Sequence, residues 1–162
     1  MNATTLVVGL GNPILGDDGV GWRVAELVRA NLDDPDVEVL CLSLGGLSLM
    51  EYLAGYRRAI IVDAMTTGAT PGNLYSMSAR EMDELCAQHT ASVHDLSLSS
   101  ALAFGRGVGL DLPEEIWVVG VEAQPEFDFG ETLSEPVSQA VSAAASAVEA
   151  WLCRVNPPPP MP

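Results

Sequence analysis

The segment GLGNPILGDDGVG (Gly9–Gly21) joins two apolar patterns of different period. Before it, Leu6–Leu10 is a short apolar run with β-branched residues, which predicts a buried strand. After it, Val20, Val24 and Val28 recur at the spacing of one face of a helix. The segment therefore predicts a glycine-rich turn between a strand and a helix, the setting in which many loops hold a phosphate group.

The alternation of strand-like and helix-like patterns continues along the whole chain. Because the strand-like runs are apolar on both faces, they favour a parallel sheet covered on both sides. We therefore expect an α/β fold, a three-layer α/β/α sandwich around a mostly parallel, twisted sheet of about five strands. The predicted strands are 6–10, 37–42, 59–63, 72–77 (a weaker run that suits an edge) and 116–121. The predicted helices are one beginning near residue 20, then 49–56, 79–88, 95–106 and 137–152.

The length of 162 residues suits one globular domain, which we assign to residues 1–154. Residues 155–162 are rich in proline and are expected to form a disordered tail. No basic N-terminal segment or bilayer-length apolar run is present, so we expect a soluble, cytoplasmic protein. We also expect a monomer. The three cysteines are widely spaced, with no CxxC pair, and are expected to be reduced thiols.

The formal net charge is −15, with 22 acidic residues against seven basic ones. Proteins that bind phosphate backbones use clustered Lys and Arg, whose binding releases counterions. We therefore expect neither nucleic acid nor an anionic membrane as a partner.

Two nucleotide-binding motifs can be tested against Gly9–Gly21, and both fail. The dinucleotide fingerprint GxGxxG needs a third glycine where this chain has Ile14. A P-loop needs lysine where this chain has Asp17, and a carboxylate there would repel a triphosphate. The acidic pair Asp17 and Asp18 favours a cation or acid/base chemistry instead.

Ligands of open α/β sheets gather at the carboxyl ends of the strands. Asp18 at the start of the first helix and Asp63 at the tip of the third strand would share this edge. Each has a structural alternative, a helix cap for Asp18 and hydrogen bonds to loop amides for Asp63, and Asp17 is interpreted as a cap. The segments expected at this edge are 9–21, 43–46, 63–72 and 122–126.

The chain has two histidines, His89 and His94. His89 lies in a polar segment and is expected to be solvated. His94 precedes a predicted helix, whose N-terminus disfavours imidazolium, so the residue is either a cap or a neutral ligand. Asp18, Asp63 and His94 together would suit a divalent first-row metal such as nickel or zinc.

The order of these motifs resembles the hydrogenase maturation proteases, the nickel-dependent endopeptidases of [NiFe]-hydrogenases. The resemblance covers about residues 4–152, and its first motif, strand-end aspartate and histidine follow one another in the family's order. The family's metal-binding acids fall on Asp18 and Asp63, and its histidine falls on His94. The residues that carry the resemblance are 9–12 with 17–21, 45–46, 62–64 with 71–72, 94, and 120–125 with 133–134.

The resemblance implies an activity and a partner. The large-subunit precursor of a [NiFe]-hydrogenase would be cut after nickel insertion, just beyond its last metal-binding cysteine motif. Ni2+ would come with the precursor and act as the recognition signal, although other divalent metals are expected to occupy the site in vitro. Asp18, Asp63 and His94 would engage the nickel and position the peptide for attack by water.

Two alternatives remain open at this point. A non-catalytic metal- or peptide-binding module of the same fold needs only the same three residues. The pentapeptide Gly9–Pro13 also resembles the start of peptidyl-tRNA hydrolases, but those continue to a catalytic histidine, and this chain has none before His89.

Overall fold

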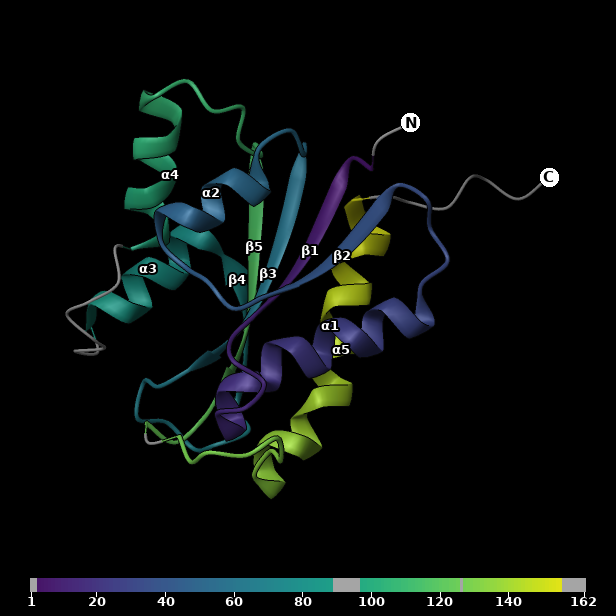
Figure 1. Cartoon of the computed structure of the whole chain (residues 1–162), viewed down its shortest axis with the longest axis vertical. Coiled ribbons are helices and arrows are strands. Elements are labelled where there is room, and N and C mark those ends of the chain that lie inside the picture. The colour runs from purple at the N-terminus through teal and green to yellow at the C-terminus, as the bar shows by residue number, and fades with distance from the viewer. Residues whose placement is uncertain (1–2, 89–96, 126, 156–162) are drawn as a thin grey trace.

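Five strands form one mixed sheet in the order β2-β1-β3-β5-β4 (Figure 1). The computed structural model describes residues 3–88, 97–125 and 127–155. Strands β1, β2, β3 and β5 run parallel, and β4 pairs with β5 in the antiparallel sense at the edge. The strands span β1 Thr5–Leu10, β2 Val37–Leu42, β3 Arg58–Met65, β4 Leu74–Ser78 and β5 Glu115–Glu122.

Helices cover both faces of this sheet, so the predicted three-layer α/β/α architecture is confirmed (Figure 1). Helices α1 and α5 pack on one face, and α2, α3 and α4 pack on the other. A single 3-10 turn, η1, precedes α1. The bounds are η1 Gly16–Gly19, α1 Val20–Asn31, α2 Leu47–Leu53, α3 Ala79–Gln88, α4 Leu98–Gly107 and α5 Glu135–Val155.

Alternation along β1 divides the apolar interior into two clusters. Leu6, Val8 and Leu10 face the layer of α2, α3 and α4, whereas Val7 faces α1 and α5. All of these side chains are buried, as expected for a central strand whose successive residues point to opposite faces. The uniformly apolar sequence of β1 is therefore explained by helices on both sides.

Helix α1 approaches the sheet at backbone contact distance. A Cβ atom on Gly21 would lie 2.2 Å from the Leu10 carbonyl oxygen and 2.5 Å from that of Val62. A Cβ atom on Gly9 would lie 2.3 Å from the Gly21 carbonyl oxygen. Only glycine fits at these two positions, so the start of α1 rests directly on β1 and β3.

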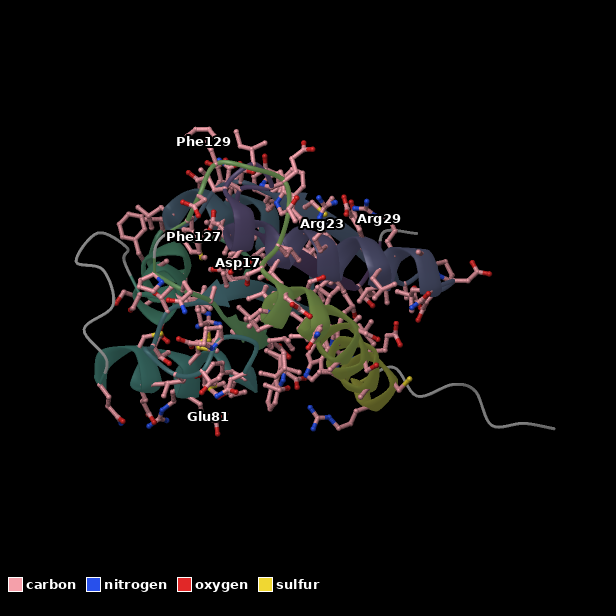
Figure 2. All side chains as sticks on the ribbon, turned by 90° about the horizontal axis from the view of Figure 1, so that it is seen from below. Asp17, Arg23, Arg29, Glu81, Phe127 and Phe129 are labelled. Carbon is pink, nitrogen blue, oxygen red and sulfur yellow. The ribbon has the colours of Figure 1, made fainter. Side chains whose placement is uncertain are left out.

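Asp17 is structural, but it does not cap its own helix as predicted. No side-chain hydrogen bond caps η1 or α1. Instead the buried Asp17 carboxylate accepts hydrogen bonds from the Ser134 backbone N–H at 2.7 Å and from its hydroxyl at 2.8 Å. Asp17 therefore attaches the segment before α5 to the turn before α1, at the sheet edge viewed in Figure 2.

Several predicted boundaries move by a few residues. Strand β3 continues to Met65, so Asp63 is not its last residue, and α2 begins and ends earlier than predicted. The predicted start of α4 at residue 95 lies outside the described residues, and so does the predicted tail 155–162 except for Val155, which is the last residue of α5. Within the described ranges, no helix is both long and apolar enough to cross a membrane.

The Gly21 contact gives a stability prediction. Gly21→Ala should destabilise the protein by about 1–3 kcal/mol, because the added methyl group must displace strand backbone rather than a flexible side chain. Urea unfolding monitored by circular dichroism measures the change. Gly107→Ala is the matched control, since its Cβ would meet no atom within 4 Å and α4 favours alanine there. Equal midpoints for the two variants would contradict the proposed backbone contact.

Candidate functional site

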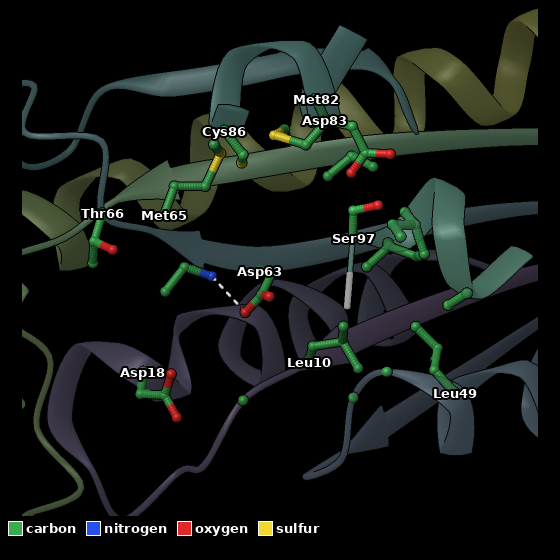
Figure 3. A pocket seen from close by; sticks show the side chains of 18 of the residues that line it. Leu10, Asp18, Leu49, Asp63, Met65, Thr66, Met82, Asp83, Cys86 and Ser97 are labelled. Atoms are coloured by element: carbon green, nitrogen blue, oxygen red, sulfur yellow. Dashed lines mark hydrogen bonds between the residues drawn. The ribbon is translucent and has the colours of Figure 1, made fainter. Parts of the chain in front are cut away.

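A cavity of about 690 Å3 opens at the carboxyl edge of the sheet, on the side of α2, α3 and α4 (Figure 3). Its walls come from β1, β3 and β5, from the segment after β2 and from three helices. The larger part of the wall is apolar, and carboxylates occur at separate points along it. The apolar side chains that line it include those of Leu10, Leu49, Ile61, Met65, Met82 and Leu98.

Asp18 lies in η1 and lines this cavity. Its Oδ2 accepts the Asn12 backbone N–H at 2.9 Å. Gly11 adopts a φ of 129°, and a Cβ there would lie 1.8 Å from the Asp18 carbonyl oxygen. The glycine-rich loop therefore folds back on itself, and an amide that could have held a phosphate binds the loop's own carboxylate.

Asp63 lines the same cavity from β3. It stands in register with Gly120 of β5, two residues before the strand ends. Its Oδ1 accepts the Ala64 backbone N–H at 2.8 Å, the hydrogen bond drawn in Figure 3. The structure thus brings Asp18 and Asp63 to one cavity, although they are 45 positions apart in the chain.

The third predicted ligand, His94, and the second histidine, His89, both lie outside the described residues. Among the residues that are described, no group of three His, Cys, Asp or Glu side chains is arranged to hold a metal ion. The two carboxylates are oxygen donors of the kind that divalent cations accept. They supply part of a ligand set, and the assignment of His94 to it stays a prediction.

Helix α3 adds two polar groups to the cavity that the sequence analysis did not identify, Asp83 and Cys86. They are three positions apart and so lie on one face of the helix. This spacing is the feature of the sequence that could have identified them as a pair. The Asp83 carboxylate accepts the Ser99 backbone N–H at 2.8 Å, so it joins α3 to α4. Burial raises the pKa of the Cys86 thiol, and Asp83 and Asp63 raise it further. Cys86 is therefore held as a neutral thiol rather than as a nucleophilic thiolate.

Glu122, at the end of β5, is completely buried. Its Oε1 accepts the backbone N–H groups of Thr67 and Gly68, and its Oε2 accepts the hydroxyls of Thr67 and Tyr75. The segment 122–126 was expected at this edge, but its buried carboxylate was not distinguished from the rest. Glu122 thus holds the loop after β3, which continues the cavity wall at Thr66 and Thr67.

The hydroxyl of Tyr75 is held as a donor toward Glu122. Burial is the main cause that raises the pKa of this hydroxyl. The hydrogen bond with Thr67 opposes the rise, and the Glu122 carboxylate adds to it. The protonated Tyr75 hydroxyl donates a hydrogen bond to the buried Glu122 carboxylate, and a buried acceptor without such a donor would be destabilising.

Comparison with known proteins gives one consistent family. The family described as hydrogenase maturation protease (HycI) matches residues 22–151. Hydrogenase 2 maturation protease of Escherichia coli (strain K12) is 31% identical over 155 residues, covering 90% of this chain and 93% of that protein. Hydrogenase expression/formation protein HupM of Azotobacter chroococcum mcd 1 is 29% identical over 148 residues, covering 91% of this chain. The chain spans 70% of the length of that relative.

The fold agrees with the sequence comparison. The solved structure of the hydrogenase maturating endopeptidase HybD from E. coli superposes with a TM-score of 0.78 at 28% identity. The superposition covers 94% of this chain and 93% of that chain.

The Glu122 anchor gives a second stability prediction. Glu122→Ala should lower the free energy of unfolding by about 3 kcal/mol, because it leaves two part-buried backbone amides and two part-buried hydroxyls without their acceptor. Glu122→Gln should cost less, since the hydroxyls of Thr67 and Tyr75 can accept from its amide. Chemical denaturation measures both, with the exposed Glu51→Ala on α2 as control. A loss no larger than that of Glu51→Ala would refute the anchoring role.

Proposed function

Because the chain belongs to the hydrogenase maturation protease family, we propose that it cleaves the large-subunit precursor of a [NiFe]-hydrogenase. The cut removes the C-terminal extension of that precursor after nickel insertion. The enzyme is a hydrolase, and its specific role is this endopeptidase step.

One observation carries the proposal: Asp18 and Asp63, from distant parts of the chain, line one cavity. The family's acidic positions fall on these two residues. The carboxylate of the adjacent acid, Asp17, accepts two hydrogen bonds from Ser134, and Asp17 does not line the cavity. The distinction between neighbouring acids supports a site role for Asp18 and a structural role for Asp17.

The cavity suits a polypeptide better than a small ion alone. A volume of about 690 Å3 is within the range of pockets that enclose sizeable organic ligands. Its apolar walls can cover side chains of an extended segment, and residues 43–46 line another part of the wall. A peptide that enters from the open edge would pass close to both carboxylates.

Nickel is part of the substrate in this proposal. Asp18, Asp63 and His94 would contact the nickel that the precursor already holds and so recognise a loaded subunit. Two carboxylates and one imidazole are few ligands, so affinity depends on those that the precursor itself supplies. The enzyme alone is then expected to bind free nickel weakly.

Hydrolysis requires that water attack the scissile carbonyl carbon, that the C–N bond break, and that a proton reach the leaving amine. Asp18 and Asp63 are groups of this chain able to take a proton from the attacking water. Cys86 is a poor candidate for the nucleophile because burial and the nearby carboxylates keep its thiol protonated. Water activated beside the carboxylates is therefore the proposed nucleophile.

A binding module without activity would use the same residues, and turnover separates the two. Asp18→Asn, Asp63→Asn and His94→Ala should each slow processing of nickel-loaded precursor by about 100-fold or more, with folding retained. Product mass and gel shift measure conversion, and circular dichroism measures folding. The exposed surface variant Asp33→Asn is the control and should process normally. Normal processing by the Asp18 and Asp63 variants would refute the site, and binding without cleavage by the wild type would favour the module.

Nickel recognition has its own test. Wild-type protein incubated with nickel-free precursor should leave the C-terminal extension in place, while nickel-loaded precursor is converted under the same conditions. Conversion is followed by mass spectrometry, and the metal content of each precursor is measured first. Equal cleavage of the two forms would remove nickel recognition from the proposal and leave the protease activity intact.

A further inference from the structure

Phe129 is the most exposed large apolar side chain in the part of the chain that is described, with 86% of its surface accessible. It lies between β5 and α5 on a loop at the carboxyl edge of the sheet. Figure 2, which views this edge, shows Phe129 projecting outward from the loop, while Phe127 lies closer to the body of the protein. Phe127 packs against the core of α1 and α5, and Phe129 does not.

The loop that carries Phe129 is held in place by backbone hydrogen bonds. The Gly130 N–H donates to the Ile14 carbonyl at 2.8 Å, and the Gly16 N–H donates to the Gly130 carbonyl at 2.8 Å. Leu15 and Gly130 form a parallel bridge between the two loops. Phe129 is thus presented on restrained backbone, which lowers the entropy lost when such a side chain is buried in a partner.

The loop has two further attachments, one to α1 and one to Asp17 of η1. Arg23 of α1 donates to the Glu131 carbonyl at 3.1 Å, and Ser134 is bound to the Asp17 carboxylate. The exposure of Phe129 therefore occurs within a segment that is fixed at several points.

Ile14 extends the apolar surface. Its side chain is 46% exposed. Ile14 and Phe129 each come directly before one of the two residues that form the parallel bridge, Leu15 and Gly130. We refer to Ile14 and Phe129 together as the rim patch. Neither residue lines the cavity, although Asn12 and Asp18, on either side of Ile14 in the same loop, both do. The rim patch therefore lies outside the cavity, and its Ile14 belongs to a loop in which other residues line the cavity.

The charge around the rim patch restricts its partner. Asp128 precedes Phe129 and Glu131 follows Gly130, and both acidic residues are exposed. With a net charge of −15, a second copy of this chain would be repelled, whereas a basic surface would be attracted. The complementary partner offers an apolar recess edged by Lys or Arg.

We propose that the rim patch is a docking surface for the folded body of the precursor protein, separate from the cavity that receives its scissile segment. The inference rests on the proposed function and extends it, because the cavity can hold only the part of the precursor near the cut. A rigid, central aromatic residue is the type of side chain that contributes most to protein–protein binding. Phe129 then selects the folded subunit, while Asp18 and Asp63 act on its extension.

The test compares Phe129→Ala with wild type on a nickel-loaded precursor that the wild type processes. Phe129→Ala should raise KM by about 10- to 100-fold and leave kcat at saturation unchanged, because the anchor is lost and the cavity is intact. Phe104→Ala is the matched control, since Phe104 is also an exposed phenylalanine, on α4, and does not line the cavity. Its KM should equal that of the wild type.

Direct binding of the precursor, measured by biolayer interferometry, separates this inference from the proposed function. If the wild type processes the precursor and Phe129→Ala keeps the same KM and affinity, the docking surface is refuted and the function stands. If the wild type binds without processing, and binding depends on Phe129, the function fails and the docking surface stands. If the wild type neither binds nor processes it, both fail. A dimer in sedimentation velocity that Phe129→Ala dissociates would assign the patch to self-association and overturn the proposal.

Discussion

The contact between Gly9 of β1 and Gly21 of α1 is the constraint on which the site depends. Without side chains at these positions, the helix backbone rests on the strands, and a Cβ on either residue would overlap a carbonyl oxygen. This contact sets the height of α1 above the sheet and thereby the path of the loop between them. The loop must return sharply, so that Gly11 meets the backbone of Asp18 and places its carboxylate at the cavity. The close helix–strand packing that a dinucleotide fingerprint assigns to its third glycine is provided here by Gly21.

The acidic residues at the carboxyl edge divide into two groups by what they bind. Asp17 and Glu122 are buried and satisfied by donors from distant loops, so they stabilise the segments around the cavity. Asp18 and Asp63 line the cavity and each accept a local backbone N–H. Among these four acids, exposure to the cavity distinguishes the proposed catalytic pair from the structural pair, whereas Asp83 also lines the cavity but accepts the Ser99 N–H of a second helix. The match to the hydrogenase maturation proteases displaces the peptidyl-tRNA hydrolase alternative.

Much of the fold could be predicted because its signals are local. β2 and α3 were predicted with the bounds observed, and the weak run near Leu74 is indeed the antiparallel edge strand. The misassigned role of Asp17 has a different origin, because its partner Ser134 is 117 positions away and leaves no trace in local spacing. Asp83, Cys86 and Glu122 were missed for the same reason, since each acquires its role from elements that meet only in the folded chain.

The sequence by itself determined the α/β layering, the turn between β1 and α1, and Asp18 and Asp63 as candidate acids. Period-2 and period-3.6 patterns and glycine placement are properties of neighbouring residues, so they can be read without coordinates. Only the tertiary structure decided that the two acids share a cavity, that Asp17 and Glu122 hold its surrounding loops, and that Phe129 stands exposed on a fixed loop. Burial and partnership depend on long-range packing, which no local pattern specifies.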